Sequence, residues 1–246
     1  MDFIEGIVLK SLDYKDSSKI LYLYTDKGLL SVIAHGVKKM NSINRFLSQN
    51  GNLIKFTHSS GKFPSLKEGE LVNDFPVIKE DIIAYTYMNH IMELVNNTIS
   101  EDLDHSKMFS FLNRLFLLFN EKYDSEILSF IFELKLLFFL GYGLNFKKCN
   151  VCDDNINLVF CVDSGGLICK EHLSFNQESF DSDIYNILRE LYYIDINKYK
   201  ELKITDNQKV IIRHIVDLLF DQYVSFSTKS RKILLQLQIP SQTLQM

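Results

Sequence analysis

Residues 149–172 read CNVCDDNINLVFCVDSGGLICKEH and hold all four cysteines of the 246-residue chain. Cys149 and Cys152 form a C-x-x-C pair, and Cys169 and His172 form a C-x-x-H pair after a gap of 16 residues. The two-residue spacing lets the chain turn tightly, so that both side chains of a pair reach one ion. Thiolates and imidazoles are ligands that zinc prefers. The stretch therefore predicts a zinc site with four protein ligands, which makes the zinc structural rather than catalytic.

Between the two pairs, the sequence has the composition of a β-hairpin. The apolar run Leu158–Phe160 is followed by the turn Asp163–Gly166 and the apolar pair Leu167–Ile168. Cys161 lies inside this hairpin and is better explained as a small buried hydrophobic residue than as a ligand. A site with Cys161 in place of His172 would also be closed, so the fourth ligand stays open at this point.

Unrelated buried thiols and a disulfide are the competing explanations of the cysteines. Four cysteines confined to 21 residues argue against unrelated thiols. A disulfide needs an oxidising compartment, and the acidic start Met1–Glu5 lacks the apolar core of a secretory signal. The most apolar stretch, 127–144, contains Glu133 and Lys135, which favours a buried helix over a membrane span. We therefore expect a cytoplasmic protein.

Composition and charge exclude some classes of protein. A hydrophobic content of 46 %, with 19 Phe and 12 Tyr, excludes a disordered chain, and the length allows one or two domains. The net charge of −4 and the pI of about 5.9 exclude a uniformly basic surface. Residues 1–80 hold 11 Lys and Arg against 9 Asp and Glu, a net charge of +2 against −6 for the remainder. We expect any contact with a polyanion on the N-terminal part.

The first eighty residues contain short apolar runs separated by turn residues. The expected strands are 3–12, 18–25, 29–35, 52–58 and 69–77. Five short strands in this length predict a small closed β-barrel of the OB type. The segment Gly36–Asn52 is polar and basic and is expected to form a mobile loop.

From about residue 80 the apolar residues recur with a helical period. The expected helices are 80–99, 105–121, 124–141, 181–194, 206–226 and 228–237. The expected N-caps are Asp104, Asp124, Asp181 and Thr205. The predicted fold class is α+β and multidomain, with an OB-like barrel at 1–79 and an α-helical domain at 80–246. A zinc finger at about 146–175 is inserted into the helical domain.

Several short motifs, taken in order, resemble the RecO family of DNA repair proteins. The runs Glu5–Lys10 and Ser18–Leu21 are similar to the family's N-terminus, and Ala34–Lys39 continues that pattern. The cysteine block at 149–172 looks like the family's zinc finger, and Lys229–Lys232 resembles its C-terminal motif. The resemblance spans nearly the whole chain.

The resemblance implies a non-enzymatic mediator of DNA recombination and of the repair of DNA damage. Such proteins bind single- and double-stranded DNA and anneal complementary strands. They pair with RecR, contact the C-terminal tail of the single-stranded-DNA-binding protein, and help to load RecA. The resemblance also implies a cytoplasmic, nucleoid-associated location. The alternative is a zinc-stabilised protein-interaction factor with weak or no DNA binding.

An OB-like barrel binds a single strand with cations along the backbone and aromatic faces beneath the bases. The candidate phosphate contacts are Lys38, Lys39, Arg45 and Lys19, with Lys10 and Lys55 as helpers. The candidate stacking residues are Tyr14, Tyr22, Tyr24 and Phe56. The competing explanation is that the lysines are merely solvated and that the aromatic rings pack within the sheet.

A second basic patch is predicted near the C-terminus, where an acidic protein tail ending in apolar residues would dock. Its candidate residues are Lys229, Arg231 and Lys232, with Arg213 as a further member. The alternative is a positively charged helix end that balances the helix dipole, or a solvated face. No phosphate-binding G-x-x-x-x-G-K-S/T loop, H-E-x-x-H, G-x-S-x-G or G-x-G-x-x-G motif occurs, so the sequence indicates no common enzyme class.

Overall fold

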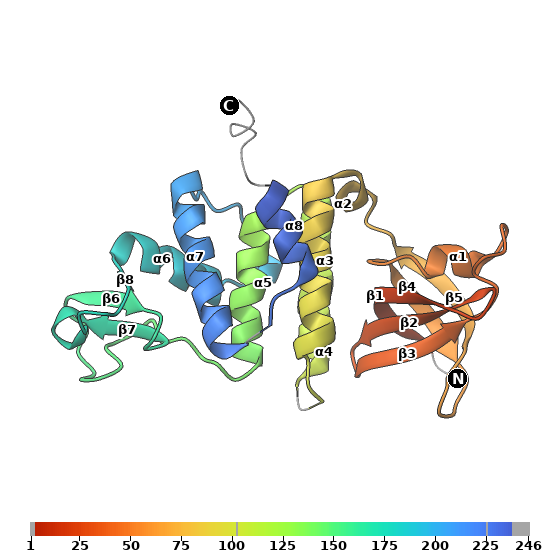
Figure 1. Cartoon of the computed structure of the whole chain (residues 1–246), viewed down its shortest axis with the longest axis horizontal. Coiled ribbons are helices and arrows are strands. Elements are labelled where there is room, and N and C mark those ends of the chain that lie inside the picture. The colour runs from red at the N-terminus through yellow and green to blue at the C-terminus, as the bar shows by residue number, and fades with distance from the viewer. Residues whose placement is uncertain (1–2, 102, 225, 238–246) are drawn as a thin grey trace. The chain divides into compact units, whose positions relative to one another are not determined.

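The computed structural model describes residues 3–101, 103–224 and 226–237. Its fold is α+β, with an N-terminal sheet followed by helices and a small second sheet (Figure 1). The chain divides into two compact units, the first formed by the described residues of Met1–Ser125 and Thr228–Met246, the second by Glu126–Ser227. This division differs from the predicted boundary at 79/80, because α-helices that follow residue 80 make most of their contacts within the same unit as the sheet. A grouping by contacts does not test a domain boundary, so the boundary at 79/80 stays a prediction.

The N-terminal sheet contains the five expected strands. They are β1 (Ile4–Tyr14), β2 (Ser18–Thr25), β3 (Gly28–Ala34), β4 (Leu53–His58) and β5 (Leu66–Asn73). All neighbours pair antiparallel in the order β3-β2-β1-β4-β5. At one point the two edges meet, because the Ile33 N–H donates to the Pro64 carbonyl at 2.8 Å and Ile33 forms a parallel bridge with Ser65.

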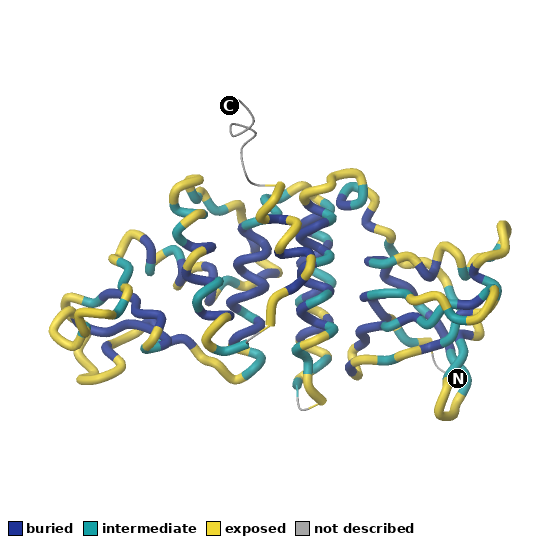
Figure 2. Tube along the Cα trace, in the orientation of Figure 1, coloured by how far each residue is buried: buried dark blue, intermediate teal, exposed yellow. Residues whose placement is uncertain are grey.

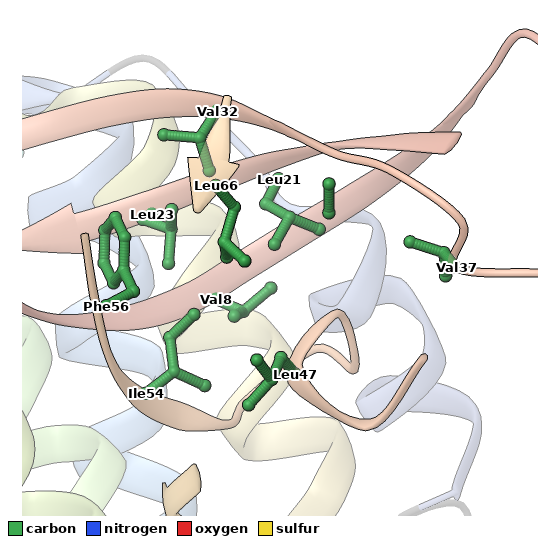
Figure 3. Close-up of a cluster of buried hydrophobic side chains, with 10 residues drawn as sticks. Val8, Leu21, Leu23, Val32, Val37, Leu47, Ile54, Phe56 and Leu66 are labelled. Atoms are coloured by element: carbon green, nitrogen blue, oxygen red, sulfur yellow. The ribbon is translucent and has the colours of Figure 1, made fainter. Parts of the chain in front are cut away.

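A cluster of hydrophobic side chains, aliphatic except for Phe56, fills the interior of this sheet (Figure 3). Leu21 and Leu23 are fully buried while Tyr22 between them is half-buried, as the alternation of side chains along a strand requires. Leu47 from the short helix α1 (Ile43–Leu47) joins the cluster. The expectation of a mobile loop over Gly36–Asn52 was therefore wrong at α1, because burying Leu47 orders that helix.

Four helices complete the first unit: α2 (Pro76–Glu80), α3 (Ile82–Thr98), α4 (His105–Asn120) and α8 (Lys229–Leu237). Helix α2 replaces the end of the predicted strand 69–77, because proline suits the first turn of a helix but not a strand interior. Asp104 accepts the Lys107 N–H at 3.1 Å and caps α4 as expected, whereas α3 is capped by Asp81. Helices α8 and α3 lie side by side (Figure 1).

The second unit combines helices with a three-stranded sheet in the order β7-β6-β8. Its elements are α5 (Ser125–Phe139), β6 (Leu158–Cys161), β7 (Gly166–Cys169), η1 (Lys170–His172), β8 (Ser179–Phe180), α6 (Ser182–Tyr193), η2 (Ile196–Lys198) and α7 (Asp206–Tyr223). Most of α5 is buried (Figure 2), and its Glu133 is paired with Arg213 of α7 at 2.8 Å. Thr205 and Gln208 form the capping box of α7, which confirms that predicted N-cap.

Among the described residues, no helix is both long enough and apolar enough to cross a membrane.

Candidate functional site

The two cysteine pairs converge at the base of the β6–β7 hairpin. Cys149 and Cys152 lie in the loop before β6, Cys169 ends β7, and His172 ends the turn η1. One ligand atom from each of the four lies within 4.8 Å of the others. The Sγ atoms of Cys152 and Cys169 are 3.8 Å apart. This matches the edge of about 3.8 Å expected for a tetrahedron with Zn–S bonds of about 2.3 Å.

The surroundings of Cys149 favour its metal-binding form. Its sulfur accepts N–H groups from Val151 at 3.4 Å and Cys169 at 3.3 Å, and it lies 3.9 Å from Nδ1 of His172. Burial alone raises the pKa of Cys149, but the backbone N–H groups of Cys152, Cys169 and Val151 outweigh it and lower the pKa to about 6. The lowered pKa favours the thiolate at Cys149, and the thiolate is the form that binds metals.

The hairpin is fixed by its contact with the segment before Cys149. The Leu167 N–H donates to the Asn145 carbonyl at 2.9 Å, and the Asn145 N–H donates to the Gly165 carbonyl at 3.1 Å. A Cβ at Gly166 would lie 2.5 Å from the Asn145 carbonyl oxygen, so only glycine fits there. Among the described residues the four-ligand group excludes Cys161, which is buried in a cluster with Val159 and Ile168.

A basic pocket lies in the first unit, with a volume of about 690 Å³. Three of the four cations predicted to contact phosphates line it, Lys19, Lys38 and Arg45. The other lining residues are Ser11, Val37, Ser48, Gln49, Asn50, Lys79 and Tyr85. The pocket is thus lined by residues of β1, β2 and α1 together with residues of α2 and α3, all in the first unit.

Two lysines of the basic pocket, Lys38 and Lys19, make a surface ion pair and a hydrogen bond to a neutral group, respectively. Lys38 pairs with Asp13 at 3.2 Å on the surface, where such a pair contributes little stability. Lys19 donates to the Ser11 hydroxyl at 3.3 Å. Lys39 is exposed on the turn after Gly36 and is not among the lining residues, so the structure does not bring it into the pocket.

Comparison with known proteins places the chain in a family. A family model described as Recombination protein O N terminal matches residues 1–75, and one described as Recombination protein O C terminal matches residues 79–232. The chain belongs to the RecO family. Proteins named DNA repair protein RecO from Bacillus cereus (strain AH187), Bacillus anthracis and Bacillus cytotoxicus are each 28% identical to it over 242 residues, 95% of this chain and 96% of the relative.

Two of the stacking candidates in this RecO-family chain are buried, so that interpretation was wrong for them. Tyr24 is fully buried, and its hydroxyl lies 3.2 Å from Nδ1 of His105. Phe56 is fully buried in the core of the sheet. Tyr22 is half-buried beneath the ammonium of Lys10, 4.4 Å from its ring centroid. No local sequence pattern marks Lys79 and Tyr85 as pocket residues, because they lie on helices that follow the sheet in the chain.

The C-terminal motif of this RecO-family chain forms the first turn of α8. Lys229 and Lys232 are exposed, but Arg231 is only 7% exposed. The helix-dipole alternative was wrong, because cations stabilise the C-terminal end of a helix and not its first turn. Arg213 was also wrongly expected to present a charge in this patch, since its guanidinium is buried and paired with Glu133.

Proposed function

We propose that the chain is a DNA repair and recombination mediator that acts by binding rather than by catalysis. Its relatives are named for DNA repair, and both family models are named for recombination. The observation that carries the proposal is the basic pocket, which gathers Lys19, Lys38 and Arg45 from separate elements. In the proposed mechanism, these side chains bind the phosphates of single- and double-stranded DNA and release its counterions.

The N-terminal sheet supports an OB-like barrel within 1–79. Its two edge strands approach each other where Ile33 bonds to the segment before β5, which is the contact that a closing five-stranded sheet requires. OB folds commonly bind oligonucleotides. The helical domain at 80–246 would then carry the remaining contacts of the protein.

The basic pocket also suggests how two DNA strands would anneal. Cations on one surface offset the repulsion between the phosphates of complementary strands, so the strands can meet. The proposed partners are RecR and the single-stranded-DNA-binding protein, and the proposed result is the loading of RecA in the cytoplasm at the nucleoid.

We further propose that Cys149, Cys152, Cys169 and His172 hold a structural Zn²⁺ in a zinc finger at about 146–175. The donor set and the separation of 3.8 Å between Cys152 Sγ and Cys169 Sγ support this assignment. Zinc would supply the folding free energy that so short an insertion lacks.

The DNA-binding proposal is tested with the triple variant Lys38→Ala, Lys39→Ala, Arg45→Ala. Single-strand affinity should fall, and the slope of log affinity against log salt should flatten by about 1.4 for the loss of Lys38 and Arg45, or by about 2 if Lys39 also contacts a phosphate. The matched control replaces three exposed lysines outside the pocket, Lys27, Lys62 and Lys67, with alanine. The same proteins are assayed for annealing of complementary oligonucleotides. An unchanged salt slope together with unchanged annealing favours the protein-interaction alternative.

The partner-binding proposal rests on the exposed surface of α8. Ile233 and Leu235 are 47% and 50% exposed, and Lys229 and Lys232 are exposed on the same helix. Apolar and cationic groups together suit an acidic tail with an apolar end. Because Arg231 is mostly buried, the test uses Lys229→Glu with Lys232→Glu and a titration with the tail peptide of the single-stranded-DNA-binding protein. Equal affinity of variant and parent would remove this proposal.

A further inference from the structure

Two residues of the basic pocket are not explained by cations on a sheet surface. Lys79 lies in α2 and Tyr85 lies in the first turns of α3, so both come from the helices of the first unit. The pocket volume of about 690 Å³ is within the range of about 300–1,000 Å³ typical of small-ligand sites. Its lining is mainly cationic and polar, whereas most such sites are mainly apolar. The walls therefore suit a compact ligand that carries negative charge.

Lys79 provides a half-buried ammonium group. Its Nζ donates to the side-chain oxygen of Asn52, a neutral acceptor, and among the described residues no carboxylate lies within ion-pair distance of it. Burial lowers the pKa of Lys79, and the charge of Asp74 opposes that effect. An anion entering the pocket would offset the cost of keeping this ammonium charged away from water.

Tyr85 provides a half-buried ring in the wall of the pocket. Asp81 caps α3 by accepting the N–H groups of Ile83 and Ala84 at 2.8 and 3.1 Å, so the backbone that carries Tyr85 is fixed. Within the described part of the chain, the Tyr85 ring stacks on no other aromatic ring. A flat ring without an aromatic partner, beside several cations, is the arrangement that receives an unstacked base and its phosphate.

We propose that the basic pocket holds one unpaired nucleotide of single-stranded DNA, with its base on the Tyr85 ring and its phosphate between Lys79 and Lys19. This rests on the proposed DNA binding and names the part of the ligand that the pocket takes. A duplex keeps its bases paired and stacked, and extracting one requires unpairing it. The pocket is then the source of a preference for single strands, while the other lining cations, Lys38 and Arg45, serve both forms of DNA.

The test compares Tyr85→Leu, Tyr85→Phe and Lys79→Met in the full chain, with an oligothymidylate and a duplex of equal length as ligands. Tyr85→Leu should weaken single-strand binding about tenfold, the order of one lost base–aromatic stack, with duplex binding and the salt slope unchanged. Tyr85→Phe should bind as the parent does. Lys79→Met should weaken single-strand binding and flatten its salt slope by about 0.7. Lys107→Met, an exposed lysine outside the pocket, is the matched control.

The outcomes separate this inference from the function on which it rests. If Tyr85→Leu and Lys79→Met bind single strands as the parent does while the triple variant does not, the nucleotide pocket is wrong and DNA binding stands. If the triple variant also binds normally, both are wrong. An equal loss on duplex and single strand overturns the stacking role. Displacement of the oligomer by micromolar thymidine monophosphate assigns the pocket to free nucleotides and overturns the inference. Thermal unfolding of each variant verifies folding, and Tyr85→Phe tests the pocket with the ring retained.

Discussion

Glu93 of α3 caps α8 through Ser230, which lies 137 residues further along the chain. Its Oε1 accepts the Ser230 hydroxyl at 2.9 Å, and its Oε2 accepts the backbone N–H groups of Lys229 at 2.7 Å and Ser230 at 3.4 Å. The first N–H groups of a helix lack acceptors within the helix, and a carboxylate there also favours the dipole. Glu93 therefore holds the C-terminal helix on the first unit and offsets the cations of its first turn.

Replacing Glu93 with Ala should lower the free energy of unfolding by about 1–2 kcal/mol, the cost of losing a helix cap and a charged hydrogen bond. Urea unfolding of the full chain measures the change. Glu121→Ala, which removes an exposed carboxylate paired with Arg114, is the control and should change the free energy of unfolding by less than about 0.5 kcal/mol. Equal losses in the two variants would mean that α8 does not depend on this cap.

The sequence predicted the strands, most helices and the cysteine cluster because each leaves a local pattern. Leu21, Tyr22 and Leu23 alternate in burial, and Cys149 and Cys152 keep ligand spacing. Contacts between distant segments leave no such pattern. Three of the four predicted DNA-binding cations line one pocket, yet the same pocket also takes residues from α2 and α3 that no motif links to the sheet. Phe56 was wrongly predicted to stack on bases, because an aromatic residue in a strand can lie on the buried inner face of the sheet as well as on its exposed face.

The buried ion pair of the second unit gives a second prediction. Arg213 Nη2 lies 2.8 Å from Glu133 Oε2, Arg213 Nη1 donates to Glu133 Oε1 at 2.9 Å, and the guanidinium stands 4.6 Å from the centroid of the Phe130 ring. Glu133→Gln should destabilise the chain by about 3–5 kcal/mol, because it leaves a buried charge without its main counter-charge.

The double variant Glu133→Met, Arg213→Met should be much less destabilised than Glu133→Gln, because no buried charge remains at the pair. Urea unfolding of Glu133→Met, Arg213→Met and the double variant forms the cycle that measures the coupling, with Glu133→Gln measured beside it. A double variant as unstable as Glu133→Gln would mean that packing rather than charge decides this site.

The metal assignment predicts one zinc per chain in protein purified without chelator. Cys152→Ser should lose the metal because it removes a thiolate ligand, whereas Cys161→Ala should retain it because Cys161 is a core residue. Elemental analysis of the three proteins measures the ratio of zinc to protein. Metal loss in Cys161→Ala with retention in a His172→Ala variant would assign the fourth ligand to Cys161 instead.

Zinc retention should decrease as the pH falls, because protonation of the Cys149 thiolate competes with metal binding. Its pKa is lowered from 9.0 to about 6, so the thiolate contribution to stability is fully present above pH 9 and is lost as pH falls through about 6. Protons and the metal compete for the same sulfur, so zinc should be retained at pH 8 and released progressively below about pH 6. Equilibrium dialysis across this range, followed by elemental analysis, measures the release. Retention that improves as pH falls would contradict the thiolate assignment.

Gly166→Ala should loosen the metal-binding hairpin. The added Cβ would lie 2.5 Å from the carbonyl oxygen and 2.9 Å from the nitrogen of Asn145, so the backbone must move apart, at a cost of about 1–3 kcal/mol. Because Asn145 holds the hairpin beside Cys149, zinc affinity should fall together with stability. Gly143→Ala is the matched control, since the nearest atom to its Cβ is the Tyr192 hydroxyl at 4.0 Å. Competition with a chromogenic chelator measures both affinities, and equal values would show that the close approach at Gly166 does not position the ligands.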